Sequence, residues 1–123
     1  MYVPQPYGTV IPFDIVGMPA KLVAEILDAE YSVGTRAGSF CTYELLRRFK
    51  GISPEEDKRI AAEVKQGVTT SIPSIVRASF SIYNTLQDAT TFVRAVEEIS
   101  ARGIEFYTSR YQCDPLRGHW QAV

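Results

Sequence analysis

The chain has 123 residues, of which 46% are hydrophobic and 22% are charged, a composition typical of one globular domain with its own core. Its 13 basic and 14 acidic residues give a net charge of -1, without the basic excess that nucleic-acid-binding proteins usually carry. No apolar run is long enough to span a membrane, and two cysteines with one histidine make neither a disulfide framework nor a zinc site. We therefore expect a cytoplasmic protein that binds neither nucleic acid nor a membrane.

The first third of the chain predicts two strands around one helix. Residues 1–8 hold two prolines and a glycine, which is typical of an irregular lead-in. Residues 9–16 alternate as a half-buried strand does, and Pro12 indicates an open edge or an irregular part of that strand. Apolar residues then recur at helical spacing as far as Tyr31, and β character returns over residues 31–37.

Two helices are predicted in the middle of the chain. The segment after Cys41 carries a helical apolar stripe, and Gly51 provides a stop signal. Ser53 and Pro54 are the residues expected at the N-cap and first position of the next helix. That second helix has a thin apolar face, so we expect it at the periphery.

The last part of the chain predicts a strand, a helix and a tail. Residues 75–83 show the cleanest alternation in the sequence, with one apolar and one polar face. Thr85 begins a helix with a core stripe that runs through Ser100, and Gly103 ends it. Residues 104–123 are interpreted as a short apolar stretch followed by an irregular tail. Together the elements predict a two-layer α/β (α+β) domain, a small sheet with helices on one face.

Cys41 lies between a glycine-bearing turn and the start of a helix. Backbone N–H groups and the helix dipole at such a place favour a thiolate, which suits nucleophilic chemistry. The same pattern also begins many ordinary helices. A thiol enzyme acting alone would need a base near Cys41, and the single histidine, His119, is in the tail.

Several separated pieces of the sequence resemble one family in the same order. SVGTRAGSFC, LLRRF and VRASFSIYNT, followed by an amphipathic helix, resemble the C-terminal small domain of class V aminotransferases, within them the cysteine desulfurase branch. The resemblance covers roughly residues 8–102. It implies the small, mainly antiparallel sheet of fold type I pyridoxal-phosphate enzymes.

The resemblance also implies what the chain needs in order to act. Such enzymes hold pyridoxal 5′-phosphate through a lysine of a large domain, and none of the four lysines here lies in that motif. Residues 1–123 are then one small domain, whose partners are the absent large domain and an amino-acid substrate, in a homodimeric parent. We expect the chain alone to bind no cofactor and to be inactive. The alternative is a free-standing binding or regulatory domain without catalysis.

Three residues match positions that have roles in the family. Arg77 matches the arginine that binds the substrate α-carboxylate, a task suited to a guanidinium fork; the alternative is an exposed strand arginine. Cys41 matches the persulfide-forming nucleophile of desulfurases, although Ser39 and Phe40 stand where close relatives have imidazoles. Its alternative is a small helix-start residue. Arg36 matches an arginine at the active-site edge, and its alternative is a salt bridge with a nearby carboxylate.

Overall fold

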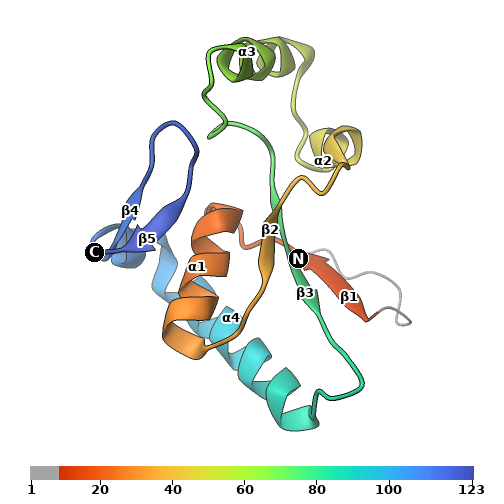
Figure 1. The fold of residues 1–123 in the computed structure, drawn as a ribbon, viewed down its shortest axis with the longest axis vertical. Coiled ribbons are helices and arrows are strands. Elements are labelled where there is room, and N and C mark those ends of the chain that lie inside the picture. The colour runs from red at the N-terminus through yellow and green to blue at the C-terminus, as the bar shows by residue number, and fades with distance from the viewer. Residues whose placement is uncertain (1–8) are drawn as a thin grey trace.

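A computed structural model describes residues 9–123, so the predicted lead-in at residues 1–8 lies outside the described residues. Figure 1 shows a small sheet with two helices against it and two others beyond its end. In chain order the elements are β1 (Val10–Phe13), α1 (Ala20–Tyr31), β2 (Arg36–Gly38), α2 (Tyr43–Phe49), α3 (Pro54–Lys65), β3 (Ile75–Ser79), α4 (Leu86–Thr108), β4 (Tyr111–Cys113) and β5 (Trp120–Ala122).

The main sheet has three strands in the order β1-β3-β2, so β3 is the central strand. Both pairings are antiparallel, with Pro12 and Arg36 each opposite Arg77 on the two sides of β3. Since β1 is an edge strand, Pro12 lies where a residue without an N–H is tolerated. The predicted α+β class and the antiparallel sheet are confirmed.

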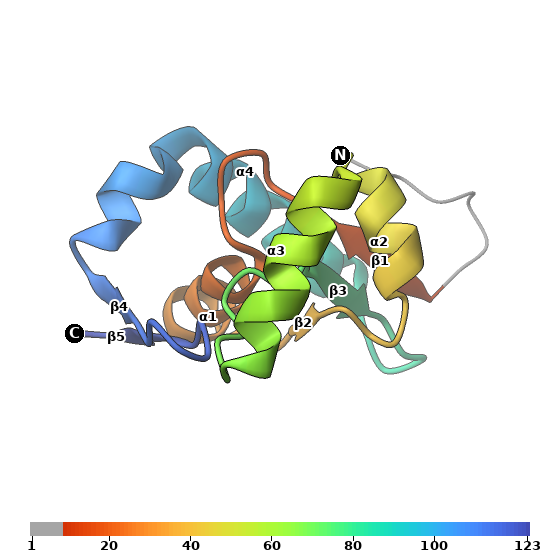
Figure 2. The same cartoon turned by 90° about the horizontal axis from the view of Figure 1, so that it is seen from above.

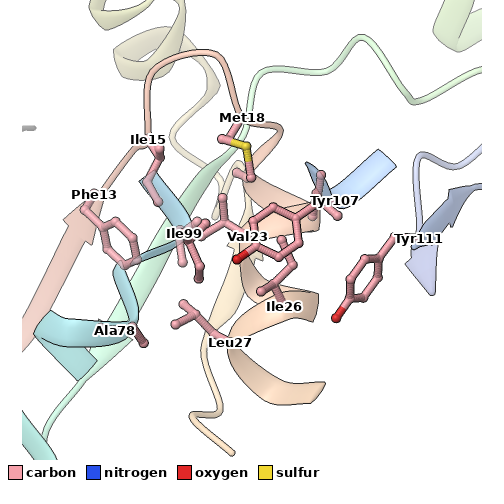
Figure 3. Close-up of a cluster of buried hydrophobic side chains, with 14 residues drawn as sticks. Phe13, Ile15, Met18, Val23, Ile26, Leu27, Ala78, Ile99, Tyr107 and Tyr111 are labelled. Carbon is pink, nitrogen blue, oxygen red and sulfur yellow. The ribbon is translucent and has the colours of Figure 1, made fainter. Parts of the chain in front are cut away.

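One face of the sheet is covered by α1 and α4. Val76 and Ala78 point from β3 into this layer and are 0% and 4% exposed. They contact apolar side chains that recur at helical spacing on the two helices, among them Val23, Leu27 and Ile99, all fully buried (Figure 3). This is the strongest source of stability in the domain, because each such side chain contributes about 1.5–3 kcal/mol on burial.

A separate unit is formed by α2 and α3, which lie together beyond one end of β3 (Figures 1 and 2). Their inward side chains, Leu46 and Ile60, are each 3% exposed. The hydroxyl of Tyr43 donates a hydrogen bond to Asp57, which ties the two helices to each other. As predicted, α3 begins at a serine cap, since Ser53 Oγ accepts a hydrogen bond from the third residue of the helix.

The strand predicted over residues 75–83 ends earlier, at Ser79. Ile82 belongs to the apolar face of the alternation predicted over residues 75–83, and its expected place in the core is wrong because Ile82 is 92% exposed. A turn follows the strand instead: the Asn84 side-chain oxygen accepts a hydrogen bond from the backbone N–H of Ser81 at 2.7 Å. Hydrogen bonds between an asparagine side chain and the local backbone compete with the hydrogen bonds of a sheet, and here they end the strand.

The β character predicted over residues 31–37 is also displaced, to Arg36–Gly38. Ser32 adopts a left-handed conformation with φ of 55°, and the N–H of Val33 bonds back to Leu27. This arrangement closes the C-terminus of α1 before any strand can begin. Val33 contributes to the core as a loop residue rather than as a strand residue.

Residues 104–123 are ordered into a helical turn and a hairpin, so the predicted irregular tail is wrong. Gly103 has φ of 72° and ψ of 173° and kinks α4, but a further helical segment follows it as far as Thr108. The chain then forms the antiparallel pair β4–β5. Trp120 of β5 packs against the main core, which fastens the hairpin to the side of α1 (Figure 1).

Candidate functional site

The face of the sheet opposite α1 and α4 carries two arginines side by side. Arg36 of β2 and Arg77 of β3 are direct partners in the antiparallel register, so their side chains share this face. Like charges placed directly opposite each other on a sheet destabilise it. The structure therefore brings together the two arginines that the sequence singled out, at an electrostatic cost to the fold.

Neither arginine is neutralised by the part of the chain that the structure describes. Within residues 9–123, no carboxylate forms an ion pair or hydrogen bond with the side chain of Arg36 or Arg77. By contrast, Arg47 and Arg102 each contact two acidic residues. The salt bridge considered for Arg36 is thus not formed here.

Arg77 is held partly inside the protein. Its side chain is half-buried, and its Nε is inaccessible to solvent and has no hydrogen-bond partner among the described residues. The centre of its guanidinium lies 4.3 Å from the centroid of the Phe40 ring, which is cation–π distance. A buried donor without a partner usually costs about 1–3 kcal/mol. Arg77 is therefore a half-buried cation that contacts Phe40 and still has N–H groups free to donate hydrogen bonds.

The segment Ser39–Thr42 connects β2 to α2 through a strained turn. Phe40 and Cys41 have φ of 50° and 61°, the left-handed region that bulky residues rarely adopt. The N–H of Thr42 donates to the Ser39 carbonyl at 2.8 Å and closes the turn. Positive φ at both central residues is the pattern of a type I′ turn, which normally uses Asn-Gly.

Cys41 is exposed at the tip of this turn, one residue before the N-cap of α2. It lines an open depression with the first residues of the helix, including Glu44. Two flanking arginines bind the Glu44 carboxylate and lower its pKa. Thr42 caps no helix N–H with its side chain, which instead donates to the Ser39 carbonyl.

The remaining candidate nucleophile and base lie elsewhere. His119 lines a different cleft, beside Trp120 and the outer side of α1, and Figures 1 and 2 place this hairpin away from α2. The structure therefore does not bring His119 to Cys41. Cys113 is half-buried in β4, and burial raises the pKa of its thiol, which makes it less nucleophilic.

Phe40 is the site residue that the sequence did not reveal. A single aromatic residue after a glycine and a serine predicts no more than a packing role. Its contact partner, Arg77, is 37 positions further along the chain. Positive φ is expected at glycines, yet the turn places it at Phe40 and Cys41 rather than at Gly38. No sequence signal would have found this geometry.

The described part of the chain holds neither a membrane-spanning helix nor a metal-binding cluster. Within residues 9–123, no helix is long and apolar enough to cross a membrane. The same residues hold no cluster of three or more histidine, cysteine or acidic side chains suited to a metal ion.

Fold and site together define a small α+β domain with one helix-covered sheet face and an arginine pair on the other. The sequence pattern of the family described as Aminotransferase class-V matches residues 1–92. The chain belongs to this family.

A curated relative agrees with the family assignment. A probable cysteine desulfurase of Halobacterium salinarum is 32% identical over 91 residues, which are 74% of this chain and 17% of the relative. The chain thus spans less than a fifth of the length of that protein. No solved structure matches the chain.

Proposed function

We propose that this chain is the C-terminal small domain of a pyridoxal-phosphate-dependent, cysteine desulfurase-like enzyme, and that Arg77 with Arg36 binds the α-carboxylate of its amino-acid substrate. The observation that carries the proposal is the cross-strand arginine pair without a carboxylate partner among residues 9–123. A substrate carboxylate would supply the missing charge and accept the free N–H groups. Arginine forks bind carboxylates through two parallel hydrogen bonds, which fix orientation as well as charge.

The chain's own lysines do not fit the role of holding the cofactor. Lys21 donates to the carbonyl of Arg117 at 2.7 Å, and Lys50 pairs with Asp14 at 2.8 Å. The other two lysines are exposed on α3. In our proposal the cofactor, which supplies an electron sink when bound, is held by a large domain outside this chain, in a homodimeric parent. The small domain alone is then inactive.

Cys41 is the second residue of the proposed site. Its exposure and its place in the turn next to Phe40 support a role as the acceptor of sulfur from a cysteine substrate. The acceptor must be a thiolate, and Cys41 has no imidazole near it among the described residues. We therefore assign Cys41 only this family role, which depends on groups that the other domain would contribute.

The test is the steady-state kinetics of the complete enzyme that contains this domain. Loss of a charged, bidentate contact should lower kcat/KM for the amino acid by about 10- to 100-fold in Arg77→Ala, mostly through KM. Arg77→Lys should recover little, because a point charge cannot replace the fork. Arg94→Ala is the matched control, since Arg94 is an exposed arginine on α4. Unchanged kinetics in Arg77→Ala would refute the assignment.

A further inference from the structure

Phe40 belongs to the strained turn and also contacts the half-buried guanidinium of Arg77. Phe40 adopts a φ that glycine would adopt without strain, and it carries the ring that covers Arg77. Backbone strain at a bulky residue persists only where the surroundings enforce it, and such residues cluster at functional sites. Glycine at position 40 would therefore cost less conformational energy than the phenylalanine that the turn carries.

The contact determines which atoms of Arg77 can bind. Nε is inaccessible to solvent, while no described residue uses the terminal nitrogens of the guanidinium. A ring 4.3 Å from the guanidinium centre restricts rotation of its plane. A guanidinium fixed in this way presents its terminal Nη pair to a ligand, and a preorganised group loses less entropy on binding.

We propose that Phe40 is a positioning residue for Arg77: its ring, delivered by the left-handed turn, fixes the guanidinium plane and leaves the Nη end for a carboxylate. The binding part of this inference rests on the function proposed above. The effect of Phe40 on the Arg77 guanidinium does not rest on that function, because the contact exists in the chain without any ligand.

The chain offers a matched pair of substitutions for the test. Phe40→Gly removes the ring and relieves the backbone strain, so the variant should fold at least as stably as the unsubstituted chain. Cys41→Gly makes the same backbone change at the neighbouring position of the turn and keeps the ring. Any difference between the two variants therefore reports the ring itself.

The first measurement is solvent exchange of the Arg77 Nε–H proton by NMR on the 123-residue chain. Phe40→Gly should speed this exchange by about fivefold or more, the factor expected from losing a cation–π contact that shields the group. Cys41→Gly should leave it unchanged, and Phe40→Trp should preserve slow exchange. Equal exchange in Phe40→Gly and the unsubstituted chain would overturn the proposal. So would acceleration in Cys41→Gly as large as in Phe40→Gly.

The second measurement is acetate binding, followed on the Arg36 and Arg77 side-chain signals. Phe40→Gly should weaken acetate binding about fivefold, and Phe40→Trp should restore it. If the unsubstituted chain shows no saturable acetate binding, the proposed function fails, and with it the binding role of Phe40. If acetate binds equally to the unsubstituted chain and to Phe40→Gly, only the role of Phe40 is refuted.

Discussion

The two faces of β3 differ in how completely other parts of the chain pack against their side chains and neutralise their charges. On one face Val76 and Ala78 are buried among the side chains of α1 and α4. On the other, Arg77 lies opposite Arg36, and its buried Nε donates to no group within residues 9–123. The first face is arranged for stability and the second is left electrostatically incomplete. If the proposed binding role of the second face holds, alternating residues of one strand serve stability and binding separately, and mutation can separate the two roles.

The largest effect is expected on the helix-covered face. Leu27 of α1 is 0% exposed within the core, so Leu27→Ala removes buried methyl groups and leaves a cavity. We expect a loss of about 2–5 kcal/mol in the free energy of unfolding. Urea denaturation of the 123-residue chain measures it. A loss below about 1 kcal/mol would show that this face is not the main source of stability.

A smaller effect is expected where α4 is kinked. Gly103 has φ of 72° and ψ of 173°, a conformation that is open essentially only to glycine. No atom outside its neighbours lies within 4 Å of where a Cβ would stand, so Gly103→Ala tests backbone strain alone. We expect a destabilisation of about 1–3 kcal/mol in the same assay. Ala101→Gly, at an exposed position earlier in α4, measures what glycine costs in this helix, about 1 kcal/mol. A Gly103→Ala variant as stable as the unsubstituted chain, or more stable, would argue against the strain.

On the arginine face the expected change in stability is close to zero. Arg77→Leu removes the cation–π contact, but it also removes a like-charge pair and a buried donor without a partner. We expect these opposing contributions to cancel to within about 1 kcal/mol in the free energy of unfolding. A loss as large as that of Leu27→Ala would contradict the division between the two faces.

The last prediction concerns pH and the β4–β5 hairpin. Asp114 accepts hydrogen bonds from the N–H groups of Leu116 and Arg117, which lower its pKa from the ordinary aspartate value. A lowered carboxyl pKa stabilises the fold above the unfolded-state value and loses that effect as pH falls through the folded-state value. The melting temperature of the unsubstituted chain should therefore fall toward that of Asp114→Ala below about pH 4. A constant difference between them down to about pH 2 would exclude this cause.

Local signals predicted much of the fold. Helical spacing located α1 and α4, and the side chain and backbone of Thr85 and Asp88 form the capping box expected at the start of α4. The hairpin was missed because Asp114 and Gly118 read as irregular, whereas they close its turn through the bond from Gly118 N–H to the Asp114 carbonyl. That closure depends on β4 pairing with β5, a tertiary event that local residues do not specify.

The candidate site was predictable only in part. The position of Arg77 on the polar face of the strand predicted at residues 75–83 followed from alternation, whereas its proposed role rests on resemblance to the family. The pairing of Arg36 with Arg77 depends on a strand register that periodicity alone cannot give. The contact between Phe40 and Arg77 depends on a turn whose left-handed residues are not glycines. Sequence rules for such turns point to glycine, so they do not predict a turn with Phe40 and Cys41 in the left-handed region.

The central claim is that Arg36 and Arg77 together bind a carboxylate. Its most direct test is an NMR titration of the 123-residue chain with acetate, with methylammonium and inorganic phosphate as parallel probes. We predict saturable shifts of the Arg36 and Arg77 side-chain signals with acetate, none with methylammonium, and loss of the Arg36 response in Arg77→Ala. Arg94 should show only a small, non-saturating change. Equal non-saturating shifts at all three arginines, or saturation by phosphate alone, would contradict the claim.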